Sequence, residues 1–206
     1  MRRQILFIFA IFSAVIFFGS CENEDSTKEE YPNWEYKNKQ FFSNLRDSVE
    51  TLIANGDDSW KIIPVYTQDE EYMSPTSDSV IIVNVIKDGG KVESPLYKDT
   101  VLVHYYGRLL PSTSYSEGFV FEKSYSDYTM DPSTSEPKQM AVSSTVKGFA
   151  TALMNMSVDD DWLVYVPSCL GYGASGSTKI PGYSVLIFEI NLVAFYHPGE
   201  VVPDWK

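Results

Sequence analysis

The sequence predicts an α+β domain: a twisted, largely antiparallel β-sheet that wraps on a short helix, with a helical extension before it. Several short β-rich runs are separated by polar loops, and one short helical segment precedes the final strands. A longer amphipathic segment lies closer to the N-terminus. With 206 residues, 44% of them hydrophobic, the chain can form one domain with its own core and a small extension.

The first 20 residues have the layout of a secretory signal. Arg2 and Arg3 precede an apolar run that is shorter than the ~20 residues of a membrane span and ends in small residues. The end of this run, Phe18 to Cys21, resembles a bacterial lipobox, in which the cysteine receives lipid. We therefore expect a protein of the cell envelope, lipid-anchored to the outer membrane through Cys21 and either periplasmic or surface-exposed. Ordinary signal cleavage and an uncleaved anchor are the alternatives.

Residues 21–33 are polar and acidic and predict a solvated tether. Residues 34–78 follow as a helix and extension. A helix is expected from Trp34 to Asn55, with Gly56 at its C-terminal end, because apolar residues recur there every three or four positions. The apolar stripe consists of Phe41 or Phe42, Leu45, Val49, and Leu52 or Ile53. It should pack on the main domain or on a second copy of the chain, as a homodimer.

The main domain should span residues 79–196, with a tail at 197–206. The segment 60–66 contains Pro64, which favours an edge strand or an irregular connection. Further strands are expected at 80–86, 100–110, 119–122, 162–166 and 185–195, with long polar loops at 111–118 and 123–138. A helix is expected from Thr145 to Met156, capped by Ser143 or Ser144, and should cover the concave face of the sheet.

The charge and the titratable residues argue against several functions. The net charge is −12, and no basic cluster follows the first three residues, so a nucleic-acid site is not expected. Two histidines and two cysteines give no metal-ligand spacing, and no phosphate-binding loop is present, so neither metal nor cofactor is expected. Cys169 follows an apolar strand and is expected to be buried.

Several segments, in order and spacing, resemble the FKBP-type peptidyl-prolyl cis/trans isomerases. They are 103–109 (VHYYGRL), 146–156 (VKGFATALMNM) and 166–176 (VPSCLGYGASG), followed by Ile180 with Pro181 and by 185–190 (VLIFEI). The resemblance covers residues 80–195.

The resemblance implies a set of pocket residues. Those of the catalytic pocket are Tyr105, Phe121, Glu122, Phe149, Tyr172 and Phe188, and those that bind substrate are Thr145, Val146 and Ile180. Glu122 stands where the family usually has Asp, and Phe149 where Trp is common. Tyr172 is expected to direct its hydroxyl at a ligand carbonyl.

The function implied by the resemblance is isomerisation of X-Pro bonds in exported proteins, with proline-containing polypeptides as partners. Rotation about the amide needs an apolar aromatic pocket and a few fixed donors, such as a backbone N–H near Ile180, rather than a nucleophile. A non-catalytic module that binds proline-containing segments is the alternative, and a surface adaptor acting through the N-terminal helix is a third possibility. The long loops could also reshape the pocket.

Overall fold

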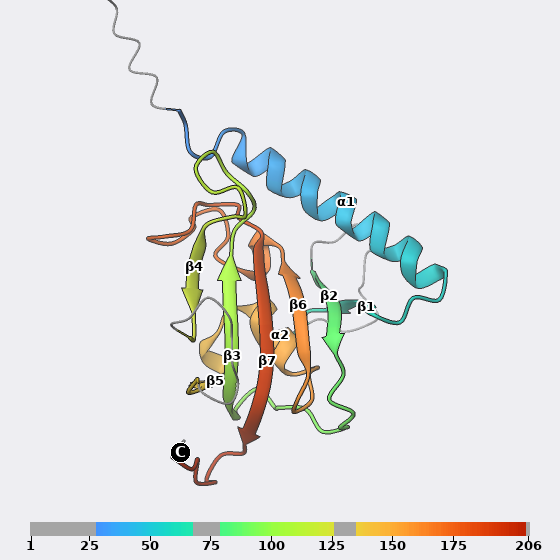
Figure 1. The fold of residues 1–206 in the computed structure, drawn as a ribbon, viewed down its shortest axis with the longest axis vertical. Coiled ribbons are helices and arrows are strands. Elements are labelled where there is room, and N and C mark those ends of the chain that lie inside the picture. Colours follow the sequence, from blue (N-terminus) through green and yellow to red (C-terminus); the bar gives the residue numbers. More distant parts are fainter. Residues whose placement is uncertain (1–27, 68–78, 126–134, 205–206) are drawn as a thin grey trace, which may run out of the picture.

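The computed structural model describes residues 28–67, 79–125 and 135–204. In these residues seven strands form one antiparallel sheet, in the order β1-β2-β6-β7-β3-β4, and β5 pairs with β3 (Figure 1). The strands are β1 (Trp60–Pro64), β2 (Val80–Lys87), β3 (Thr100–Arg108), β4 (Val120–Lys123), β5 (Lys138–Ala141), β6 (Asp161–Val166) and β7 (Leu186–Tyr196). The helices are α1 (Trp34–Ala54) and α2 (Lys147–Leu153), with short 3-10 turns η2 (Val142–Ser144) and η3 (Ser168–Leu170).

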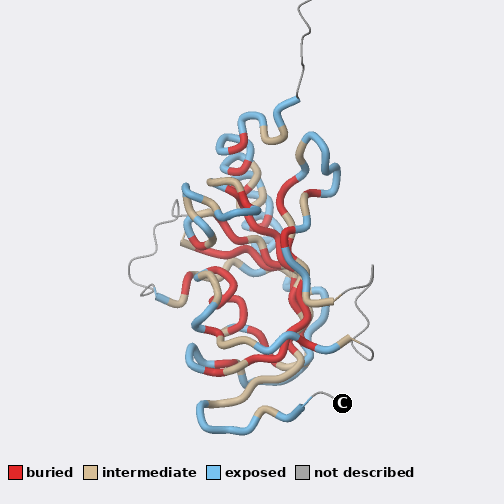
Figure 2. Tube along the Cα trace, turned by 90° about the vertical axis from the view of Figure 1, so that its left-hand side faces the viewer, coloured by how far each residue is buried: buried red, intermediate tan, exposed pale blue. Residues whose placement is uncertain are grey.

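The sheet curves around α2, and the core lies between them (Figure 2). Strand residues that alternate in the sequence point to one face, so Val101, Val103 and Tyr105 of β3 all point into this core. The side chain of Val166 on β6 lies so close to Gly148 of α2 that a Cβ there would be 2.3 Å from it. The predicted fold, an antiparallel sheet on a short helix with an N-terminal helix, is confirmed.

The second helix is shorter than predicted. The prediction was Thr145 to Met156, whereas α2 begins at Lys147 after an extended Val146 and ends at Leu153. The predicted serine cap is wrong because both serines belong to the preceding turn η2. The Ser144 hydroxyl donates to the carbonyl of Ala141 instead, at 2.7 Å.

One strand of the sheet was not predicted, and one expected edge strand is found. β5 lies at the end of the segment that was predicted as a loop, and its pairing with β3 is long-range. Pro64 ends β1, which pairs only with β2, so the predicted edge strand is confirmed. Because β1 lies within the expected extension 34–78, that extension and the main domain share one sheet.

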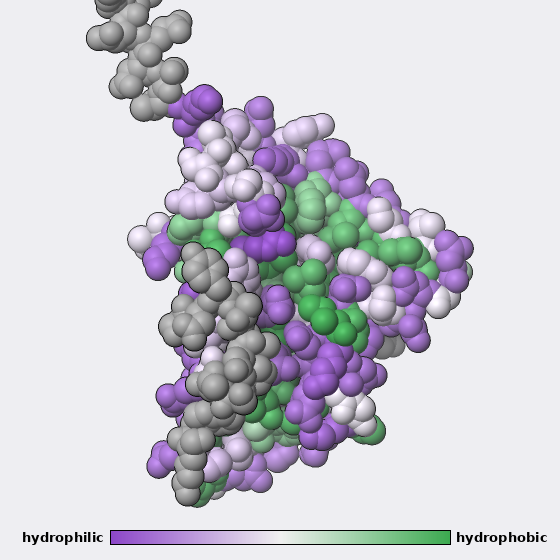
Figure 3. Space-filling model, viewed as in Figure 1, coloured by the Kyte–Doolittle hydropathy of each residue, from purple (hydrophilic) through white to green (hydrophobic). Residues whose placement is uncertain are grey.

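The helix α1 packs on the face of the sheet opposite to α2. Its Phe41 ring lies 6.0 Å from the ring of Tyr165, whose neighbour Val166 points to the other face. Phe42 and Val49 are buried, and Figure 3 shows apolar side chains gathered where α1 meets the sheet. The helix ends as predicted, with Gly56 at φ 88°. We call this contact, together with the contacts of α1 to residues 181–185, the α1 seam.

Hydrogen bonds also close the α1 seam. The indole Nε1 of Trp34 donates to Ser184 Oγ at 2.8 Å, and the backbone N–H of Val185 donates to Asn38 Oδ1 at 2.8 Å. Asn38 is 1% exposed, so its side-chain oxygen and the N–H of Val185 would be costly to leave unpaired. The extension thereby fixes the segment that leads into β7.

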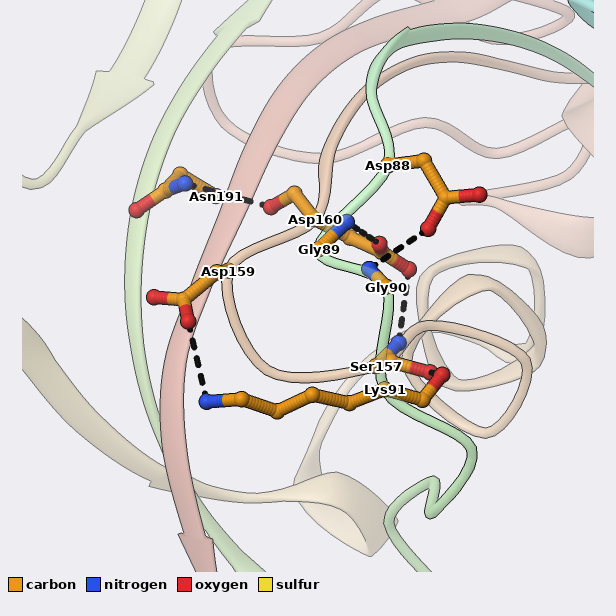
Figure 4. A network of polar contacts seen from close by, with 8 residues as sticks. All are labelled: Asp88, Gly89, Gly90, Lys91, Ser157, Asp159, Asp160 and Asn191. Atoms are coloured by element: carbon orange, nitrogen blue, oxygen red, sulfur yellow. Dashed lines mark hydrogen bonds and ion pairs between the residues drawn. The ribbon is translucent and has the colours of Figure 1, made fainter.

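The turn between α2 and β6 is tied to the loop after β2 (Figure 4). The buried Asp160 carboxylate accepts hydrogen bonds from the backbone N–H groups of Gly89 and Ser157, each at 2.7 Å. Beside it, Lys91 forms an ion pair with Asp159 at 2.9 Å. Gly89 has no room for a side chain, since a Cβ would lie 2.2 Å from the carbonyl oxygen of Val158. The loop after β2 therefore fits closely against the turn between α2 and β6.

Two sequence expectations concern residues outside the core. Cys169 was predicted to be buried, but it is exposed, because Pro167 ends β6 and the cysteine lies in η3, beyond the strand's alternation. The signal segment, Cys21 and most of the acidic tether lie outside the described residues. Within the described ranges, no helix has the length and apolar character that a membrane crossing requires.

Candidate functional site

A pocket of about 370 Å³ opens between the sheet, α2 and the segment that follows η3. It lies on the concave side of the sheet, where β3 passes from its pairing with β5 to its pairing with β4. Its lining residues are Tyr105, Phe121, Glu122, Lys138, Met140, Ser144, Thr145, Val146, Phe149, Tyr172 and Phe188. The pocket thus combines an aromatic wall with a small polar group on one side.

Four aromatic rings make up the wall, each edge-to-face with the next. The ring centroids are 5.6 Å apart for Tyr105 and Phe149, 5.0 Å for Phe149 and Phe188, and 5.5 Å for Phe188 and Phe121. Edge-to-face contacts at these distances are favourable, so the rings support one another without a ligand. All four side chains are at most 8% exposed. The wall is therefore preformed and apolar.

A β-bulge places two consecutive residues of β4 in the pocket. Gly107 pairs with Glu122 and Arg108 pairs with Val120, so Phe121 is an extra residue in the ladder. Without a bulge, neighbouring residues of a strand point to opposite faces; here both Phe121 and Glu122 line the pocket. Gly107 is required at this place, because a Cβ would lie 2.7 Å from the ring of Phe121.

The polar group of the pocket comes from three strands. Lys138 Nζ, on β5, donates to the hydroxyl of Tyr105 at 2.8 Å and to Glu122 Oε1 at 2.6 Å. Burial, assisted by a hydrogen bond to Glu122, raises the pKa of Tyr105 to about 12, although Lys138 opposes the shift. Burial also acts to raise the pKa of Glu122, but hydrogen bonds from Lys138 and Tyr105 outweigh it and lower that pKa. At neutral pH the group is a neutral phenol with an ammonium–carboxylate pair.

Tyr172 stands at the mouth of the pocket and is 39% exposed. It lies between Gly171 and Gly173, and Gly173 has a φ of 63°, so glycine allows the tight turn here. Burial, with the nearby charge of Glu122, raises the pKa of the Tyr172 hydroxyl. The hydroxyl therefore remains protonated at neutral pH and can donate to a ligand.

The structure brings together eight of the nine expected pocket residues. The exception is Ile180, which is buried but does not line the pocket, and whose N–H donates to the carbonyl of Ser177 at 3.2 Å. This N–H is thus already used within its own loop. His104, next to Tyr105, is fully buried on the other face of β3, and burial lowers its pKa.

Sequence reasoning missed Lys138, Met140 and Ser144. Lys138 and Met140 lie in β5, and Ser144 lies in η2. A lysine after a polar loop has no local signal that places it in an aromatic pocket, and β5 is recognised only by its pairing with β3. Across residues 28–67, 79–125 and 135–204, no cluster of His, Cys, Asp and Glu side chains has a geometry that could hold a metal ion.

A curved antiparallel sheet closed by a short helix, with a preformed aromatic pocket between them, defines a class of small ligand-binding α+β domains. A sequence model of the family described as "FKBP-type peptidyl-prolyl cis-trans isomerase" matches residues 91–193. The chain belongs to this family.

The matching region is also similar to two curated bacterial proteins. It is 33% identical over 110 residues to the "Peptidyl-prolyl cis-trans isomerase Mip" of Coxiella burnetii, covering 53% of this chain and 42% of that protein. It is 32% identical over 105 residues to the "FKBP-type 22 kDa peptidyl-prolyl cis-trans isomerase" of Escherichia coli, covering 50% and 45%. The chain thus spans less than half the length of these two relatives.

The fold is similar to the crystal structure of FkpA from Escherichia coli. The TM-score is 0.53 at 22% sequence identity, and the match covers 78% of this chain and 60% of that chain.

Proposed function

We propose that this protein catalyses cis/trans isomerisation of X-Pro peptide bonds. The observation that carries the proposal is the preformed aromatic pocket, which has one polar side and a tyrosine hydroxyl at its mouth. Membership of the FKBP-type family supports the same activity. The alternative is a module that binds proline-containing segments without catalysis, and the substitution of Phe149 for the usual Trp of the pocket floor gives it some support.

The pocket suits the chemistry because the reaction breaks no covalent bond. Rotation about a peptide bond loses amide resonance, and its barrier is about 20 kcal/mol. The planar amide is more dipolar than the twisted one, so an apolar wall disfavours the ground state relative to the transition state. Each ~1.4 kcal/mol of such differential binding accelerates the rotation tenfold.

Individual residues supply the rest of the differential binding. The side chains of Phe149 and Phe188 form the floor on which a proline ring would lie. The Tyr172 hydroxyl can donate to a carbonyl that flanks the rotating amide, and so hold the bound segment in place without stabilising the planar amide. No proton transfer to the substrate is needed, so the raised pKa of the phenols, which keeps them protonated, is compatible with catalysis.

A protease-coupled assay with short proline peptides tests the activity. The protein from Glu22 onward should accelerate cis/trans exchange, and it should prefer an apolar residue before the proline because the pocket wall is apolar. The control is the same protein at equal concentration with Phe149 replaced by Ala. Exchange at the uncatalysed rate, even at high protein concentration, would leave the binding module as the function.

We further propose that the protein carries lipid on Cys21 and acts in the cell envelope, where it assists folding of exported proteins. The signal-like residues 1–20 and the lipobox-like end of that segment support this proposal. Slow prolyl isomerisation limits folding in any compartment. Intact-mass analysis of the protein from its host should show an N-terminus at Cys21 with added acyl groups. A retained 1–20 segment, or a mature N-terminus elsewhere, would exclude the lipid anchor.

A homodimer through the N-terminal helix is a separate proposal about partners. The buried side of α1 is already occupied by its own domain, and Leu52 and Ile53 in its last turns are 37% and 41% exposed. A dimer that uses α1 would therefore form around these two side chains. Sedimentation equilibrium of the wild type and of a Leu52→Ser, Ile53→Ser double variant should show a dimer that the double variant loses.

A further inference from the structure

Lys138 lies at the centre of the polar side of the pocket. Its Nζ is 2.8 Å from the Tyr105 hydroxyl oxygen, 2.6 Å from Glu122 Oε1 and 5.4 Å from the centroid of the Tyr105 ring. The three residues come from β3, β4 and β5. One ammonium therefore joins three strands at the place where they form the pocket.

The position of this ammonium is set by the sheet. Lys138 is the first residue of β5 and pairs with Val103, two residues before Tyr105 on β3. Residues two apart in a strand share a face, so Val103, Tyr105 and Lys138 all lie on the concave side. The side chain of Lys138 reaches the Tyr105 hydroxyl diagonally across the pair of strands. The backbone that carries it is fixed by the pairing of β5 with β3.

Without the lysine, Glu122 would place an unbalanced negative charge beside the aromatic wall. The groups that face this carboxylate are Tyr105 on β3, Lys138 on β5, and Tyr172 and Lys179 on the segment after η3. Of the two lysines, only Lys138 forms an ion pair with Glu122. Charges in a partly desolvated site are costly unless they are paired, so the pair matters for an apolar ligand.

The same contact also prepares the tyrosine. Lys138 donates into a lone pair of the Tyr105 oxygen, so the hydroxyl proton is directed at the Glu122 carboxylate, to which Tyr105 donates. Tyr105 is 4% exposed and its ring is fixed edge-on to Phe149, so its hydroxyl has few orientations to choose from. A buried phenol with a charged donor on its oxygen is a stronger hydrogen-bond donor than one in water.

We infer that Lys138 is a positioning residue of the pocket: it neutralises Glu122 and orients the Tyr105 hydroxyl, so that the aromatic site can take up an uncharged prolyl amide. This inference rests on the proposed isomerase function. Its electrostatic half, control of the Glu122 carboxylate, can be measured without substrate.

The variant that tests it is Lys138→Met, which keeps the length of the side chain and removes the charge. Burial then acts on Glu122 with one hydrogen bond fewer to oppose it, so its pKa should rise. The wild type should show a flat kcat/KM for an apolar X-Pro peptide between pH 5 and 8. The variant should lose about tenfold at pH 8, mainly through KM, and should recover towards pH 5 as Glu122 takes up a proton.

Three further variants separate positioning from simple loss of structure. Lys138→Arg should restore most of the activity, since it returns a cation. Lys138→Met with Glu122→Gln should be more active at pH 8 than Lys138→Met alone, because it removes the unbalanced charge. Lys91→Met is the matched control: it removes a lysine of similar exposure whose ion pair with Asp159 lies outside the pocket, and it should leave the pH profile unchanged.

Carbon-13 NMR titration of the Glu122 carboxyl provides the readout that does not depend on activity. A higher Glu122 pKa in Lys138→Met than in the wild type supports the inference. Equal titration curves together with superimposable pH–rate profiles would overturn it. If the wild type were inactive, the proposed function would fall, and the carboxyl titration would still decide whether Lys138 controls Glu122.

Discussion

The pocket and the α1 seam are both rich in aromatic side chains, but they differ in how their polar groups are used. In the seam, Trp34 and Asn38 are almost fully buried and their polar atoms are hydrogen-bonded to Ser184 and Val185. In the pocket, Tyr172 lines the cavity and is 39% exposed. The two regions show that aromatic content alone does not distinguish a pocket from a packed contact; the exposure of the polar groups does.

The largest expected effect separates the two regions by replacing one phenylalanine in each. Phe149→Ala and Phe42→Ala remove side chains that are 4% and 5% exposed, so each should destabilise the protein by about 3–5 kcal/mol. Only Phe149→Ala should also abolish most isomerase activity, since Phe42 lies on the opposite side of the sheet. Urea unfolding and peptide assays, run where both variants are folded, measure the difference. Equal loss of activity in both would show that the regions are not separable.

Asn38→Ala tests how far the seam influences the pocket. The N–H of Val185 would lose its buried partner, at a cost of about 1–3 kcal/mol. Val185 is linked through Ser184 and Tyr183 to the Gly173 turn, because the N–H of Tyr183 donates to the carbonyl of Gly173. Hydrogen exchange of residues 171–185 should therefore become faster.

The control for this variant is Asn44→Ala, on the exposed side of the same helix, which should change neither stability nor exchange. Ala has the higher helix propensity at both positions, so faster exchange in both variants would mean that the effect does not come from the contact with Val185.

Tyr172→Phe should affect activity but not stability. It removes one neutral hydroxyl at a partly exposed site, so kcat/KM should fall by the equivalent of about 1 kcal/mol, and the melting temperature should stay the same. Tyr115→Phe, which removes a comparably exposed hydroxyl from the loop 111–118, should change neither quantity. If Tyr172→Phe and Tyr115→Phe lost activity equally, Tyr172 would have no particular role in ligand binding.

The smallest expected effect lies outside both regions, at Asp161 on β6. Burial, with a smaller contribution from Glu189, raises the pKa of this carboxyl from 3.8 to about 6. Ionisation of Asp161 therefore destabilises the folded state. This destabilisation is complete above pH 6 and disappears as the pH falls below 3.8. Asp161→Asn should stabilise the protein at pH 8 by less than about 1 kcal/mol, after allowance for solvent screening, and not at all at pH 3.

Thermal melting of this variant across the pH range measures the effect, with the exposed Asp58→Asn as its control. A gain that is the same at pH 3 and pH 8 would show that the charge of Asp161 is not its cause.

The sequence predicts most of the fold because the segments with a regular spacing of apolar residues are long enough to identify as helix or strand on their own. The alternation in β3 and the apolar stripe of α1 are examples, and both are found in the structure. β5 could not be predicted, because Lys138 to Ala141 contains no β-branched residue and forms a strand only by pairing with β3. The start of α2 was misplaced because Val146 is apolar in the helical pattern but has an extended backbone.

The candidate site was predictable to the extent that it follows family positions. The aromatic wall and Tyr172 lie where the resemblance places them. The polar side was not foreseen, since the partner of Glu122 is sixteen residues away, beyond a polar loop. Nor could the sequence show that the loop 111–118 is held elsewhere: Ser112 and Ser114 donate to the carboxylate of Glu30, and no residue of this loop lines the pocket.

The two borders of the sheet have a consequence for the protein's own solubility. An open strand border offers unpaired backbone groups to any extended chain, and such chains add to it and aggregate. In the described sheet β1 is five residues long, lies under α1 and ends in Pro64. The other border is formed by β4, which is four residues long and bulged at Phe121, and by β5, which is also four residues long. Proline cannot donate to a ladder, and a short bulged strand offers little template. The borders of the described sheet are thus protected from adding an extended chain through its backbone.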